Sequence, residues 1–384
     1  KGGAVYNQSL KYTDLEKRTI DITAYTTITD SDFQNNYAEY QGGAVNLWGC
    51  VTCTNVNFAY NICDGEGFYA DGSVLYYGDG GAVYISSEDE GGGIFEGVTV
   101  TSNMARLDGG GVYNYGELHS TGSTYSLNTA EESGGAIYNE GTFVLENGNI
   151  TGNNTTDIGG ALFNAGELLM KNGSVCDNST DGCGGGISNG GILTVTGGII
   201  TGNKALGTEY GGGGIYNDDG CTVTISNCTI SSNQGDLGGA IQNMGAITMT
   251  NSVIANNTAD LNGNGIFQMG ILNLGSGNTF GEDQFVYLPA GADADHKSQY
   301  VITKVGNLTG PVPIKLENEI VGRDILVSKT GATSSTEGKV VDSDLIKLIL
   351  TLSNNKYIQS YNHAGRDGED EPKDVIELSI KVLV

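Results

Sequence analysis

Gly-Gly-Ala-Ile-Tyr-Asn at 134–139 returns 25 residues later as Gly-Gly-Ala-Leu-Phe-Asn at 159–164, and after another 25 as Gly-Gly-Gly-Ile-Ser-Asn at 184–189. The same pattern stands at 2–7 and at 238–243. We call it the GGA motif: two glycines, a small residue, an aliphatic residue, any residue and asparagine. A unit that recurs at a fixed interval of this length is typical of a solenoid.

A second motif precedes most copies of the first. It is a large apolar residue, two variable residues and an asparagine, as in Tyr125 to Asn128 or Ile150 to Asn153. Between the two motifs lies a short run with alternating apolar residues, such as Leu193-Thr-Val195. Each repeat therefore predicts three short strands separated by corners rich in Gly, Asn and Asp.

Three strands with one or two inward apolar residues cannot close a core alone, but stacked copies can. Each turn then hydrogen-bonds to the turns above and below it at a spacing of ~4.8 Å, and apolar residues align in columns. We expect an all-β parallel β-helix of about ten turns of ~25 residues, ~45 Å long. The 62 glycines argue against helices, and they suit corners with left-handed backbone.

The repeats predict two regions. Residues 1–275 carry the β-helix repeats, and residues 276–384 lose the glycine motif and gain strands rich in Val, Ile and Leu. The second region is predicted to be either irregular turns of the same coil or a β-rich cap, because an open end exposes unpaired edge strands. The chain begins inside a repeat at Lys1-Gly-Gly, so we expect it to be a piece of a longer protein.

The asparagine of the GGA motif stands at the same offset in successive repeats. Asn tolerates left-handed backbone, and stacked amides can also form ladders. We expect a structural ladder of these side chains: Asn114, Asn139, Asn164, Asn189, Asn217 and Asn243.

The amino-acid composition excludes some classes of binding partner. A net charge of −27 argues against nucleic acid as a partner and against anionic membranes. No apolar run is long enough to insert in a membrane.

The seven cysteines are expected to be buried and to pack as small apolar side chains. The alternative is a disulfide between Cys176 and Cys183, or between Cys221 and Cys228.

The two motifs together resemble the repeats of polymorphic outer membrane proteins and of related autotransporter passengers. The run from Gly191 to Asn203, followed by Gly-Gly-Gly-Ile-Tyr-Asn at 212–217, more closely resembles repetitive surface proteins of Gram-positive gut bacteria. The resemblance implies a right-handed parallel β-helix exposed on a cell surface, often as an adhesin or a stalk. It concerns scaffold residues and implies no activity.

Carbohydrate chemistry is the alternative function. A polysaccharide lyase needs a base such as arginine, and a glycosidase needs two carboxylates facing each other across a groove. The acidic insertions at 60–95 hold carboxylates, and Arg106 beside Asp108 is the only arginine of the regular repeats. The candidate catalytic residues of this alternative are Asp64, Glu66, Asp79, Glu88 and Arg106.

No cofactor is expected apart from calcium. Glu88, Asp89 and Glu90 supply hard oxygen ligands, but they match neither calcium-loop spacing nor a calcium-binding repeat. The simpler interpretation of Arg106 is a surface ion pair. The simpler interpretation of these carboxylates is that they are solvated charges of a loop.

Tyrosine recurs at the variable position of the GGA motif. If Ile137 and Ile215 point inward, alternation places the following tyrosines on the outer face. Such a column could stack on sugar rings or partner side chains, and its members are Tyr6, Tyr113, Tyr138 and Tyr216. We therefore expect a non-catalytic extracellular β-helix that binds a glycan or protein of a host or neighbouring cell, or that self-associates through its coil ends.

Overall fold

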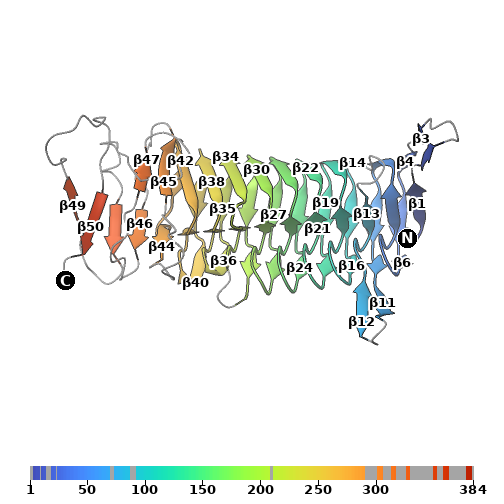
Figure 1. Cartoon of the computed structure of the whole chain (residues 1–384), viewed down its shortest axis with the longest axis horizontal. Helices are drawn as coiled ribbons and strands as arrows, with labels where there is room; N and C mark the ends of the chain where they lie inside the picture. The colour runs from blue at the N-terminus through green and yellow to red at the C-terminus, as the bar shows by residue number, and fades with distance from the viewer. Residues whose placement is uncertain are drawn as a thin grey trace.

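The chain folds as a parallel β-solenoid of about ten turns, as seen in a computed structural model (Figure 1). The structure describes residues 3–289 except 9, 14–18, 23, 70–72, 87–91 and 208–210, and beyond 289 only strands β45 to β50. Among these residues there is no helix, which agrees with the prediction from the glycine content.

Four sheets run along the coil, and we number them S1 to S4 in the order in which a turn visits them. In the repeats the GGA motif forms the strands of S1, and S1 continues past the last copy of the motif; every neighbouring pair of its strands is parallel. Its strands are β1 (Val5–Gln8), β7 (Val45–Trp48), β13 (Val83–Ile85), β17 (Val112–Asn114), β21 (Ile137–Asn139), β25 (Leu162–Asn164), β29 (Ile187–Asn189), β33 (Ile215–Asn217), β37 (Ile241–Asn243), β41 (Ile266–Gln268), β44 (Val286–Leu288), β46 (Pro313–Leu316) and β48 (Ile349–Leu352).

The alternating run of each repeat forms S2. Its strands are β4 (Tyr25–Thr29), β8 (Cys50–Thr54), β14 (Gly92–Glu96), β18 (Glu117–Thr121), β22 (Thr142–Glu146), β26 (Glu167–Lys171), β30 (Ile192–Thr196), β34 (Thr222–Ser226), β38 (Ala246–Thr250), β42 (Ile271–Gly275), β45 (Val301–Val305) and β47 (Leu326–Ser328).

The large apolar residue of the second motif lies in S3. Its strands are β5 (Asp32–Gln34), β9 (Asn57–Ala59), β15 (Thr99–Thr101), β19 (Thr124–Ser126), β23 (Asn149–Thr151), β27 (Ser174–Cys176), β31 (Ile199–Thr201), β35 (Thr229–Ser231), β39 (Val253–Ala255) and β43 (Thr279–Phe280).

A fourth sheet, S4, follows the asparagine of the second motif, so the prediction of three strands per turn was wrong. Most of its strands have two residues, too few to show any periodicity in the sequence. They are β6 (Tyr37–Ala38), β10 (Ile62–Cys63), β16 (Met104–Ala105), β20 (Thr129–Ala130), β24 (Asn154–Thr155), β28 (Ser179–Thr180), β32 (Lys204–Ala205), β36 (Gln234–Leu237) and β40 (Thr258–Asn262).

Three antiparallel pairs are added to the coil. They are β2 (Leu10–Thr13) with β3 (Thr19–Ile22), β11 (Gly65–Phe68) with β12 (Val74–Tyr77), and β49 (Ile358–Asn362) with β50 (Leu378–Val382). The β11–β12 hairpin projects sideways from the coil between S4 and S1 of an early turn (Figure 1).

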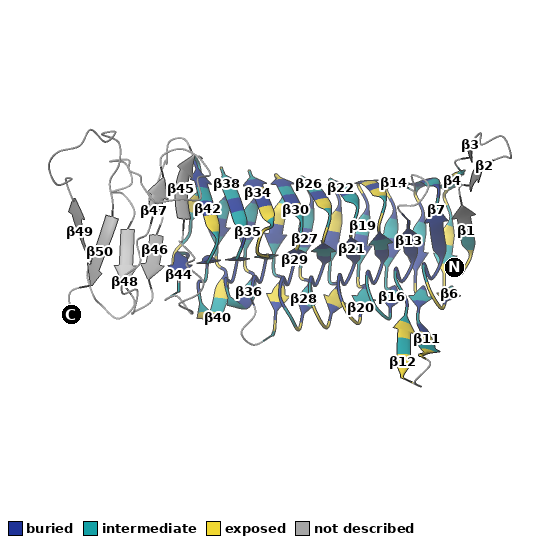
Figure 2. Cartoon of the chain, viewed as in Figure 1, coloured by how far each residue is buried: buried dark blue, intermediate teal, exposed yellow. Residues whose placement is uncertain are grey.

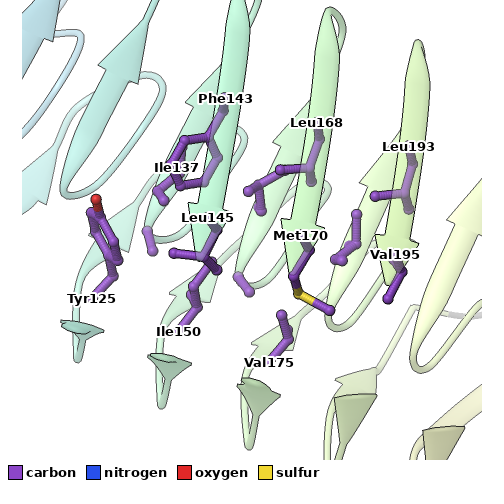
Figure 3. Close-up of a cluster of buried hydrophobic side chains, with 14 of the residues drawn as sticks. Tyr125, Ile137, Phe143, Leu145, Ile150, Leu168, Met170, Val175, Leu193 and Val195 are labelled. Atoms are coloured by element: carbon purple, nitrogen blue, oxygen red, sulfur yellow. The ribbon is translucent and has the colours of Figure 1, made fainter. Parts of the chain in front are cut away.

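The core is a set of apolar columns parallel to the coil axis. Tyr125, Ile150 and Val175 stack from S3, opposite Phe143 and its S2 successors, and all of them are buried (Figure 3). Buried residues alternate with exposed or half-buried residues along the strands of S2, as Figure 2 shows. This confirms the predicted columns and their alternation.

The glycine pair of the GGA motif has two separate functions. Gly159 has a φ of +71°, a left-handed conformation that costs an L-residue about 1–2 kcal/mol. Gly160 instead lies against the next turn, where a Cβ atom would stand 2.3 Å from the carbonyl oxygen of Gly185. The small residue that follows, Ala161, is fully buried, as its size predicts.

Buried asparagines form two hydrogen-bonded ladders. In S1 each Asn Nδ2 donates to the Oδ1 of the next turn at 2.7–3.0 Å, from Asn114 through Asn243 to Gln268 Oε1. These asparagines end extended strands and none of them has a positive φ. The alternative expectation, that they supply left-handed backbone, was therefore wrong. That conformation occurs in other residues, such as Asn147 and Asn172 at the corner between S2 and S3.

The second ladder is longer and uses the asparagine of the second motif. It runs from Asn36 through Asn257 to Gln284, with Nδ2 to Oδ1 or Oε1 distances of 2.8–3.0 Å. Each oxygen also accepts a backbone N–H, as Asn153 Oδ1 does from Asn128 at 2.8 Å. These bonds satisfy polar groups in the interior of the coil.

Candidate functional site

The tyrosine column lies on the outer face of S1. Tyr113 and Tyr138 are half-buried and follow each other in register, whereas Tyr216 lies three turns beyond Tyr138. Tyr6 is in β1, but its side chain lies outside the described residues. Phe163 and Ser188 occupy the intervening positions.

The rings of this column stack on one another. The centroid of Tyr113 lies 5.1 Å from that of Tyr84 and 4.8 Å from that of Tyr138, with interplanar angles of 16° and 12°. Tyr138 is also 5.0 Å from Phe163. Both faces of the Tyr113 ring are therefore covered by neighbours, so its edge and hydroxyl are what it presents to a ligand.

Two carboxylates lie beside this column, each directly before a glycine pair. The pKa of Asp79 is raised to about 6, chiefly by burial and in addition by the nearby carboxylates of Glu140 and Glu132. Burial likewise raises the pKa of Asp108 to about 7, although its Oδ1 accepts the Ser133 N–H at 2.9 Å. Sequence reasoning selected Asp79 but treated Asp108 only as a neighbour of Arg106, because burial is not visible in the sequence.

Replacing Asp108 by Asn tests this electrostatic cost. The raised pKa means that the folded chain holds a proton which the unfolded chain has lost, so stability falls as pH rises from about 4 to about 7. Asp108→Asn keeps an acceptor for the Ser133 N–H and removes the charge. We expect a gain of roughly 2–4 kcal/mol in unfolding free energy at pH 7.5 and little change at pH 4.

Denaturant unfolding at both pH values measures this effect. The exposed Asp181→Asn is the matched control and should give the same small change at both. An Asp108→Asn gain that is equal at pH 4 and pH 7.5 would contradict a half-buried carboxyl with a raised pKa.

Arg106 lies at the base of the β11–β12 hairpin. Its Nε is 3.2 Å from Glu131 Oε2, and its Nη1 donates to Glu131 Oε1 at 3.2 Å. Arg106 therefore makes a two-point ion pair with the next turn. Its guanidinium carbon is 4.2 Å from the ring centroid of Tyr76. Arg106 thus pairs with Glu131, while Asp108 accepts a backbone N–H instead.

The other candidates from the insertions are dispersed. Asp64 is half-buried between β10 and β11, and Glu66 is exposed on β11. Glu88, Asp89 and Glu90 lie outside the described residues. Within the described part of the chain, no three His, Cys, Asp or Glu side chains gather as a metal site.

The cysteines described as buried behave as apolar residues. Burial raises the pKa of Cys53, Cys63, Cys183 and Cys228 to about 12 in each case. Neither of the two disulfides considered from the sequence forms, because Cys176, Cys183, Cys221 and Cys228 are free thiols.

Comparison of the chain with family models, with curated proteins and with solved structures found no match. Among the described residues, no helix is long and apolar enough to cross a membrane.

Proposed function

We propose that this chain is an extracellular, cell-surface β-solenoid that acts as a stalk or adhesin and has no catalytic role. The observation that carries the proposal is the unbroken stacking of turns, in which two amide ladders and the apolar core continue from one turn to the next. A solenoid built in this way is a stiff spacer, because each turn is held by both of its neighbours.

The net charge of the chain supports a location at the cell surface. A net charge of −27 keeps such rods soluble and apart from one another at a surface. The resemblance of the two repeat motifs to surface proteins points to the same location.

Asp79 and Asp108 favour a second candidate, a glycoside hydrolase of the retaining type. They precede the glycine pairs of successive turns, whose backbones are about 4.8 Å apart, and retaining enzymes place their carboxyl groups ~5–5.5 Å apart. A pKa near neutrality also suits a general acid, as for Asp108 at about 7.

Two measurements separate these functions. For the surface role, antibodies against the chain should label intact cells of the producing organism, and labelling only after lysis would contradict that role. For catalysis, the purified chain should release no reducing ends or unsaturated products from neutral and acidic polysaccharides. Turnover that is lost in Asp79→Asn would replace the first proposal with the second.

A further inference from the structure

The β11–β12 hairpin is an addition that the coil does not need. In a regular turn, β20 ends at Ala130 and β21 begins at Ile137, whereas here β10 ends at Cys63 and β13 begins at Val83. The coil closes between S4 and S1 in both cases. The additional residues are therefore available for a purpose other than folding the turn.

The two faces of the hairpin differ. Strand pairing places Glu66 opposite Tyr76 and Phe68 opposite Val74 on one face. Phe68 is 72% exposed, Val74 42% and Tyr76 40%, so this face is open and largely apolar. On the other face Tyr77 packs against Tyr40, with ring centroids 4.7 Å apart.

The open face adjoins the next turn of the coil. Tyr76 in this face contacts the Arg106 guanidinium, which is itself paired with Glu131 of the following turn. Aromatic side chains and a set of polar groups thus meet where the hairpin leaves the coil. Small-ligand sites combine apolar surfaces with a few placed polar groups in the same way.

We infer that the open face of the β11–β12 hairpin, with the Arg106–Glu131 pair at its base, binds a neutral oligosaccharide. The exposed ring of Phe68 offers a stacking surface, and Glu66, Arg106 and Glu131 offer acceptors and donors for hydroxyl groups. The inference rests on the proposed adhesive function and names its ligand class and its site.

Size and charge select this ligand over a protein. Each strand of the hairpin has four residues and spans about 13 Å. The face of this two-stranded hairpin is therefore much smaller than the area of about 800 Å² that a stable protein interface takes from each partner. The net charge of −27 disfavours a second copy of the chain and anionic glycans. Arg106 does not offset this charge, because Glu131 already neutralises it.

The test is a glycan microarray probed with the full chain, followed by calorimetric titration of the neutral oligosaccharides that bind. Phe68→Ser and Tyr76→Ser should each weaken binding about tenfold or more, the loss of about 1.4 kcal/mol. Tyr115→Ser, which removes an exposed tyrosine of the coil body, should leave the affinity unchanged. Melting curves check that each variant remains folded.

The outcomes separate this inference from the proposed function. Unchanged affinity in the Phe68→Ser/Tyr76→Ser double variant overturns the site but leaves an adhesive rod. Binding to anionic glycans only, to cationic peptides only, or to no glycan overturns the ligand class. The cell-labelling experiment addresses the surface role independently of all these results.

Discussion

Gly160→Ala is expected to unfold the coil around its turn, with a cost of more than about 4 kcal/mol or a failure to fold. The added methyl group would lie 2.3 Å from the carbonyl oxygen of Gly185 and 2.6 Å from the carbonyl carbon of Ser179. Both belong to the backbone of the next turn, which cannot rotate away as a side chain can. Denaturant unfolding followed by circular dichroism measures the loss.

Gly122→Ala is the matched control. Gly122 has a φ of +58°, and its added Cβ would have no heavy atom within 4 Å. It should therefore cost only the backbone strain of a left-handed alanine, about 1–2 kcal/mol. Equal losses in the two variants would show that close approach of successive turns is not what requires the second glycine.

Asn153→Ala is expected to cost about 3–6 kcal/mol through loss of buried hydrogen bonds. Asn153 Oδ1 accepts from both the N–H and the Nδ2 of Asn128, and its Nδ2 donates to Tyr125 O and to Asn178 Oδ1. Alanine leaves these partners buried without replacements. Denaturant unfolding gives the total loss, and hydrogen exchange should show faster exchange of the Asn128 amide.

Asn154→Ala separates the ladder from asparagine content in general. Asn154 is the next residue, exposed in β24, and its Oδ1 accepts only a surface bond from Ser179. Its replacement should change the unfolding free energy by no more than about 0.5 kcal/mol. A similar loss for Asn153→Ala and Asn154→Ala would rule out a special contribution from the buried amides.

Periodicity accounts for the parts of the fold that could be predicted. Residues such as Ile137 and Leu162 recur at the same position of successive repeats, and in a stacked coil equal positions become neighbours. S4 was missed because two-residue strands carry no period. The second motif was recognised in the sequence, but the ladder formed by its asparagines was not anticipated.

The candidate sites were predictable only in outline. The insertions at 60–95 were expected to present carboxylates, and the described part forms a hairpin that exposes Glu66 and, beside it, Phe68, Val74 and Tyr76. Asp79 and Asp108 differ from exposed Glu66 because they are half-buried, which raises their pKa values. Alternation predicted an outward tyrosine column, but not that its rings would cover each other's faces.

The sequence by itself determined the stacked β-coil, since a constant repeat length places like residues above one another whatever the surroundings. Only the tertiary structure decided which rings retain a free face and which carboxylates are half-buried. These properties depend on atoms from other turns and from an insertion that does not repeat, such as Arg106 against Tyr76. Solvent exposure and local electric fields arise from that three-dimensional packing and not from the order of residues along one turn.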